Sequence, residues 1–135
     1  MSKSLIQTVN PSSQTVAVNS VISLGTVTRR YGCNLRLSGN GIEVSGDGYY
    51  KVDACVTLTP TAVGNVSVAM FVDGVAVSGA VATGSVSTVG NTVTLPIEAT
   101  LRRACNCCES VNNVTFVLTN GASTVDNVSV RIEKS

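Results

Sequence analysis

The feature that most constrains this chain is an alternation of polar and apolar residues with a period of two. Successive side chains of a β-strand point to opposite faces, so this period is typical of a strand with one buried face. The longest such run occupies residues 49–59. Its apolar face would consist of Tyr50, Val52, Ala54, Val56 and Leu58. Its other face would carry Tyr49, Lys51, Asp53, Cys55, Thr57 and Thr59. The run therefore predicts a long strand that covers a core with one side only.

The residues that build the alternation are mostly β-branched. The 135 residues include 24 Val and 15 Thr, whose stiff side chains pack better on a pleated sheet than on a helix. The 12 Gly and 11 Asn are the residue types that turns with positive φ require. Many short strands joined by such turns predict an all-β sandwich or barrel.

About ten strands are expected between residues 5 and 132, one of them over residues 21–27, in one domain over residues 1–135. Residues 1–20 would form an N-terminal arm or a first strand. The strongest hairpin signal is Asp73-Gly74. Gly84 is expected to interrupt a strand over residues 81–89, and Pro96 should lie in an edge strand or at a bulge.

Charge and composition exclude several function classes. The net charge is only +1, which argues against an electrostatic grip on nucleic acid or on an anionic membrane. Histidine is absent, so the commonest general base and the imidazole metal ligand are missing. No run of about 18 apolar residues could span a bilayer, and the first residues do not resemble a secretory signal. We therefore expect a non-enzymatic protein without a cofactor or metal and without a nucleic-acid or membrane partner.

Three segments together resemble one family. Residues 46–52 (GDGYYKV) look like the G-x-Y motif that opens a long central strand in the tumour-necrosis-factor-like and complement-head-like jelly rolls. Residues 68–74 are similar to the strand that leads into a hairpin in that superfamily, and residues 127–132 resemble its final strand. The resemblance implies an antiparallel two-sheet jelly-roll sandwich that packs as a homotrimer around a three-fold axis.

Within that superfamily, the short, histidine-free chain resembles small virion structural proteins of tailed bacteriophages, of the head-fibre and capsid-decoration types. That resemblance implies a homotrimer assembled in the host cytoplasm and carried on the capsid surface. Its partners would be the major capsid protein or another virion protein. The alternative is a receptor-binding head, or adhesin, that recognises a host-surface glycan or protein through loops near residues 32–34 and 104–113.

The five cysteines leave three readings open. Four thiolates, from Cys33, Cys105, Cys107 and Cys108, could hold zinc, but C-x-C-C is not the C-x₂-C spacing of zinc sites, and no metal is expected. The same four residues are a possible disulfide or redox cluster, within one chain or between subunits. Otherwise they remain reduced thiols on a loop. Cys55 is predicted to be a buried packing thiol.

Several charged and aromatic residues are candidates for subunit contacts. Arg29-Arg30 and Arg102-Arg103 would form either a basic rim, paired with acidic groups of a capsid or neighbouring subunit, or ordinary solvated strand ends, which we favour. Asp53 could serve a subunit contact, whereas Asp47 and Asp73 precede glycines and fit turns. Large rings dominate interface energetics, so the predicted trimer contacts are Tyr49, Phe71 and Phe116. Y49A is expected to weaken the trimer far more than it unfolds the monomer.

Overall fold

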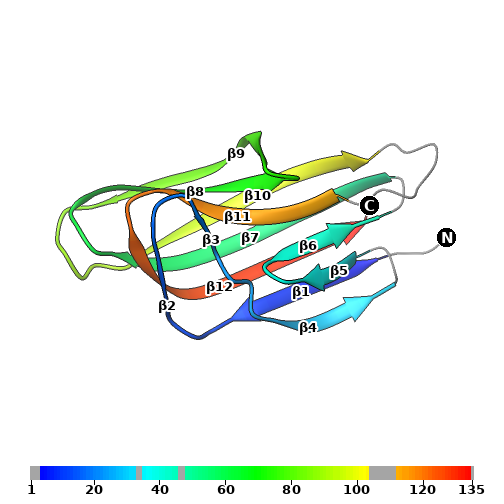
Figure 1. Cartoon of the computed structure of the whole chain (residues 1–135), viewed down its shortest axis with the longest axis horizontal. Coiled ribbons are helices and arrows are strands. Elements are labelled where there is room, and N and C mark those ends of the chain that lie inside the picture. Colours follow the sequence, from blue (N-terminus) through cyan, green and yellow to red (C-terminus); the bar gives the residue numbers. More distant parts are fainter. Residues whose placement is uncertain (1–3, 33–34, 46–47, 104–111, 135) are drawn as a thin grey trace.

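Two antiparallel sheets of six strands each lie face to face and form the whole of the described fold. The computed structural model describes residues 4–32, 35–45, 48–103 and 112–134. Figure 1 shows the long strands of both sheets running along the long axis of the molecule. In these ranges the chain has no helix, hence none that could cross a membrane. The expected all-β, antiparallel two-sheet architecture is confirmed.

The first sheet, called sheet A, contains both the long strand predicted at residues 49–59 and the last strand of the chain. Its strands follow the order β10 (Val93–Arg103), β7 (Gly48–Pro60), β12 (Ser123–Lys134), β1 (Leu5–Asn10) and β4 (Thr26–Tyr31), while β2 (Gln14–Val16) pairs separately with β12. Since β10 stands at one end of this order, Pro96 lies in an edge strand, as predicted.

The second sheet, called sheet B, covers the apolar face of sheet A. Its strands follow the order β5 (Leu35–Ser38), β6 (Gly41–Val44), β11 (Asn112–Asn120), β8 (Gly64–Val72) and β9 (Val75–Val86), while β3 (Ser20–Val21) pairs with β11. Strands far apart in the sequence are therefore neighbours in both sheets, which is why a small chain can build one continuous core.

The core lies between the two sheets and follows the period-two pattern. All five residues of the predicted apolar face of β7 are buried, from Tyr50 to Leu58. Tyr50 is wholly buried, and its hydroxyl donates a hydrogen bond of 2.7 Å to the Ser45 carbonyl oxygen. This bond removes the cost of an unsatisfied buried hydroxyl, so the ring can serve as a large apolar core residue.

The predicted strand over residues 21–27 is divided in the structure. β3 ends at Val21 and β4 begins at Thr26, while the segment between them leaves one sheet for the other. The Gln14 side chain replaces strand pairing here: its amide nitrogen donates to the Ser23 carbonyl at 3.0 Å, and its carbonyl oxygen accepts from the Ser23 N–H at 3.1 Å. Ser23 therefore keeps its backbone hydrogen bonds without being in a strand.

β9 also differs from expectation, because it runs unbroken through Gly84 as a single strand from Val75 to Val86. A Cβ at Gly84 would lie 3.0 Å from side-chain atoms of both Leu95 and Val93. The glycine thus permits a close approach of β9 and β10 rather than a break in the strand.

The hairpin predicted at Asp73-Gly74 is confirmed. Asp73 has φ 54° and Gly74 has φ 83°, the two successive positive angles of a type I′ turn between β8 and β9. The Asp73 carboxylate also accepts hydrogen bonds from the Asn113 N–H at 2.9 Å and the Asn112 amide at 2.7 Å. Asp73 is accordingly a turn residue that ties the hairpin to β11; Asp47 lies outside the described residues.

Candidate assembly surface

The outer face of sheet A, defined as the side chains of sheet A that point away from sheet B, is broad and polar. Directly opposed residues of an antiparallel pair lie on the same face of the sheet. The strand registers therefore place five residues in one row across the sheet, called the charged row: Glu98, Asp53, Arg131, Gln7 and Arg29. The next row consists of Thr100, Lys51, Glu133, Leu5 and Tyr31.

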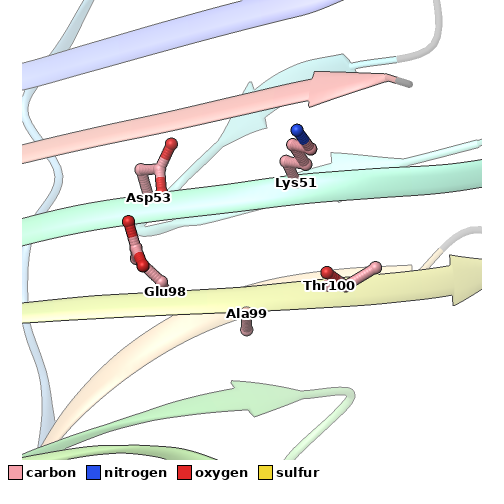
Figure 2. A pocket seen from close by; sticks show the side chains of 5 residues that line it. All are labelled: Lys51, Asp53, Glu98, Ala99 and Thr100. Carbon is pink, nitrogen blue, oxygen red and sulfur yellow. The ribbon is translucent and has the colours of Figure 1, made fainter.

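Two carboxylates are adjacent at one end of the charged row. Asp53 of β7 is directly opposite Glu98 of β10, and both residues are exposed. Figure 2 shows the two carboxylate side chains beside each other, with Lys51 and Thr100 further along the same strands. Like charges directly opposite each other destabilise a strand pair. The arrangement is unfavourable for an isolated chain.

The ion pairs of this surface do not relieve that repulsion. In the described part of the chain, the salt bridges are Arg36–Glu43 on sheet B and Arg131–Glu133 on sheet A, the latter at 3.1 Å. Arg131 is opposite Asp53 in the register, yet its guanidinium contacts Glu133 instead. The acidic pair thus retains unused hydrogen-bonding capacity.

Two hollows indent the outer face of sheet A around this pair. The larger, of about 460 Å³, is lined by Lys51, Asp53, Glu98, Ala99 and Thr100. The smaller, of about 270 Å³, shares Asp53 and Glu98 and extends to Cys55 and Arg131. Among the residues that the structure describes, no three His, Cys, Asp or Glu side chains gather as metal ligands. Both hollows are thus lined by mixed polar and charged side chains that include the acidic pair.

The positive end of the charged row lies at the β4 edge of the sheet. Every residue of β4 is exposed, including Arg29, Arg30 and Tyr31. Arg30 donates a hydrogen bond of 2.8 Å from Nε to the Leu35 carbonyl oxygen, which holds its guanidinium against β5 of sheet B. The other predicted pair, Arg102-Arg103, ends β10.

The position of Cys55 contradicts one prediction. It was expected to be buried, but its side chain is exposed on the outer face of sheet A. The reason is the strand period itself, which places Cys55 on the same face as Lys51 and Asp53. Small neighbours in the sequence favoured burial, although they do not cover it in space. Cys33, Cys105, Cys107 and Cys108 lie outside the described residues, so the three readings of that cluster stay predictions.

The three rings predicted as trimer contacts do not lie on one surface. Tyr49 is 54% exposed on the outer face of sheet A. Phe116 is wholly buried in the core between the sheets. Phe71 is half-buried on the outer face of sheet B, opposite Thr115. Only Tyr49 shares a face with the charged row, so its interface role stays a prediction for that surface.

Sheet B has a different outer face. Its register aligns four apolar residues in one row, called the apolar row: Val21, Val117, Ala69 and Val81. Val21 and Val81 at the ends of the row are 42% and 51% exposed, whereas Val117 and Ala69 are buried. The two outer faces of the molecule thus differ in chemistry, one charged and the other apolar along its middle. Sequence reasoning missed this row, since its residues come from four separate strands.

No protein-family model matches the chain, and no curated protein matches it in sequence. Solved structures, by contrast, match its fold over nearly the whole length. Murine APRIL superimposes with a TM-score of 0.74 at 11% identity, over 98% of this chain and 99% of that one. The globular domain of zebrafish complement 1qA protein gives 0.67 at 7% identity, over 95% and 94%. The PRD1 vertex protein P5 gives 0.58 at 16% identity, over 99% and 98%. The chain therefore has the TNF-like and complement-like jelly-roll fold that its motifs predicted.

Proposed function

We propose that this chain is a non-enzymatic structural protein of a bacteriophage virion, and that it forms homotrimers that decorate the capsid or project from it. The observation that carries the proposal is the match in fold, over nearly the whole chain, to the PRD1 vertex protein P5. The match extends over 99% of this chain and 98% of that one, so it concerns the whole of the given chain rather than a short shared segment.

Self-association is supported by the outer face of sheet A. This face is wide and exposed, and it holds an acidic pair at one end and Arg29 at the other. A cyclic oligomer joins two different patches of each subunit, and the ring closes when the rotation between subunits permits it. The TNF-like fold implies the trimer as the closed form. A face with two distinct, oppositely charged ends fits such a head-to-tail contact.

The geometry favours assembly over catalysis. Asp53 and Glu98 form the one adjacent carboxylate pair of the charged row, and they stand on an open sheet face. Carboxylates that act as acid or base are usually enclosed in a cleft that excludes water and shifts their proton affinity. The pair therefore supports a role in contacts with charged groups of a partner.

The proposed location is the outer surface of the virion, where a trimer would occupy a three-fold position of the shell. Its partner there would be the major capsid protein or another virion protein. A second candidate function, a receptor-binding head, is favoured by the apolar row of sheet B. Its end residues, Val21 and Val81, are large apolar side chains that stay 42% and 51% exposed, and exposed apolar surface is a feature of interaction sites. Binding of the purified protein to host cells, together with a failure to bind capsids, would favour this second function.

The first test is the solution mass of the purified full-length chain, by light scattering with and without reductant. We expect three times the chain mass of 13.8 kDa in both conditions. A trimer that dissociates in reductant would instead assign the subunit contact to intersubunit disulfides. A stable monomer at high concentration would contradict the proposal. The second step is cosedimentation of the trimer with capsids that lack it, which a virion structural protein should show.

A further inference from the structure

The charges of the outer face of sheet A cannot satisfy one another within a single chain. Neighbouring strands lie about 4.8 Å apart, so the four steps from β10 to β4 separate Glu98 from Arg29 by about 19 Å. Exposed charges interact weakly beyond about 8 Å at physiological ionic strength. Arg29 and the acidic pair are therefore electrostatically independent in the monomer.

Each end of the charged row carries an excess of one sign. At the β4 edge Arg29 is cationic, and the neighbouring Gln7, Leu5 and Tyr31 on the same face are uncharged. At the other end Asp53 and Glu98 are adjacent. The nearest arginine, Arg131, forms its salt bridge with Glu133. Lys51, one row away from the pair, lines the same hollow.

We propose that the β4 edge of one protomer docks onto β7 and β10 of the next protomer, and that Arg29 enters the hollow between Asp53 and Glu98. This inference rests on the homotrimer of the proposed function and specifies which surfaces of the trimer meet. The occupant of the hollow is a second copy of this chain. Repetition of the same head-to-tail contact around a rotation axis uses both patches of every subunit.

The chemistry of the hollow matches a guanidinium group. Two carboxylates side by side offer four acceptor oxygens, and the planar fork of arginine donates to such acceptors in a bidentate manner. The hollow of about 460 Å³ lined by Asp53 and Glu98 leaves room for that side chain. Insertion of a cation between the two carboxylates converts a repulsive cross-strand pair into an attractive group of three.

Tyr31 adds apolar contact area to the same edge. It is 66% exposed and lies on the same face as Arg29, because their partners Leu5 and Gln7 are two residues apart on β1. Tyrosine and arginine are enriched at the centres of protein interfaces, where they supply area and directed hydrogen bonds together. The apolar row of sheet B has no comparable charge pattern to select a partner, so sheet A is the surface that the charges favour.

A charge-swap series tests the pairing in the full-length protein. R29E alone and the double variant D53K/E98K alone should each raise the trimer dissociation constant at least tenfold, because each places like charges together across the contact. The triple variant R29E/D53K/E98K should restore the trimer dissociation constant to near that of the wild type. The control R36E reverses an exposed charge on sheet B and should leave the constant unchanged. Analytical ultracentrifugation measures the constant, and circular dichroism checks that every variant is folded.

The outcomes separate this inference from the proposed function. If the wild-type chain is a trimer and neither R29E nor D53K/E98K weakens it, the docking arrangement is wrong while the trimer stands. If both weaken the trimer and the triple variant does not recover, Arg29 and the acidic pair do not contact each other. If the wild-type chain is monomeric, the proposed function itself fails. Recovery in the triple variant, with R36E unchanged, supports the pairing.

Discussion

Thr8 is a buried residue of β1 whose hydroxyl oxygen finds no hydrogen-bond partner among the described residues. A buried hydroxyl without a partner costs about 1–3 kcal/mol in lost hydration. T8V keeps the branched shape and replaces the hydroxyl by a methyl group, so we expect it to raise the free energy of unfolding by about 1 kcal/mol. Urea denaturation at fixed protein concentration measures the change.

The control for this prediction is T8S, which keeps the hydroxyl and removes the methyl group. We expect T8S to lower the free energy of unfolding by about 1 kcal/mol, since it leaves a small cavity on the face of β1 that buries Ile6 in the core. A loss of stability in T8V would show that the hydroxyl has a partner, for instance a buried water, and would contradict the prediction.

Gly25 and Gly39 form a matched pair of glycines with positive φ, +80° and +59° respectively. A Cβ at Gly25 would overlap the Val9 carbonyl oxygen and Asn10, whereas a Cβ at Gly39 meets nothing within 4 Å. G39A should therefore lower the free energy of unfolding only by the backbone strain, about 1 kcal/mol. G25A should lower the free energy of unfolding by at least about 2 kcal/mol more than G39A does, because β1 and the start of β4 must separate. Equal losses in urea denaturation would contradict the steric explanation.

At the scale of single residues, the strand period predicted burial better than composition did. It assigned the buried face of β7 from Tyr50 to Leu58 correctly. It also placed Cys55 on the opposite, exposed face, and the prediction failed only where the small size of its neighbours was taken as a sign of burial. Residue type alone also could not place Phe116, because a large ring is equally suited to an interface and to a core. Its inward register on β11 places it in the core.

Among the elements, the β8–β9 hairpin depends most clearly on one side chain. Asp73 holds a positive φ of 54° and accepts hydrogen bonds from Asn113 and Asn112. D73A loses both bonds and keeps the strained backbone, so we expect the free energy of unfolding to fall by about 2 kcal/mol. D73N should lose less than about 1 kcal/mol, since asparagine tolerates positive φ and keeps an acceptor oxygen. Urea denaturation distinguishes the two, and equal losses would count against the carboxylate contacts.

Elements defined by local chemistry were predicted, and elements defined by distant contacts were not. The Asp73-Gly74 turn needs only two successive residues that tolerate positive φ, and Asp-Gly is such a pair. The division of residues 21–27 into β3 and β4 depends on the Gln14 side chain, which bonds Ser23 from another part of the chain. Likewise Gly84 was predicted to break a strand, because its close approach to Leu95 is not visible in the sequence.

At the scale of the whole molecule, the candidate surface exists only because of the sheet order. Gln7, Arg29, Asp53, Glu98 and Arg131 form one row because β10, β7, β12, β1 and β4 are neighbours in that sequence. The alternating pattern assigns each residue to a face of its own strand and says nothing of which strands are adjacent. Asp53 was therefore predicted as a possible subunit contact, yet its pairing with Glu98 was not.

The exposure of Cys55 provides a test of which outer face the trimer covers. Cys55 lines the smaller hollow beside Asp53 and Glu98, so a neighbour docked there should shield its thiol. We expect a maleimide to label Cys55 at least tenfold more slowly in the trimer than in protein diluted to monomer. Rates are compared at one pH, because only the thiolate reacts. Mass spectrometry of the peptide that contains Cys55 distinguishes it from the other four cysteines.

The matched control for this experiment is V81C, which introduces a thiol on the outer face of sheet B at a position that is 51% exposed. Its labelling rate should be the same in trimer and monomer if sheet A is the covered face, because sheet B then remains open to solvent. The opposite pattern, with Cys55 labelled at equal rates and V81C protected by assembly, would move the interface to the apolar row. In that case burial of Val21 and Val81 would drive assembly, and the trimer should tolerate high salt, whereas an interface centred on Arg29 and the acidic pair should weaken as salt screens it.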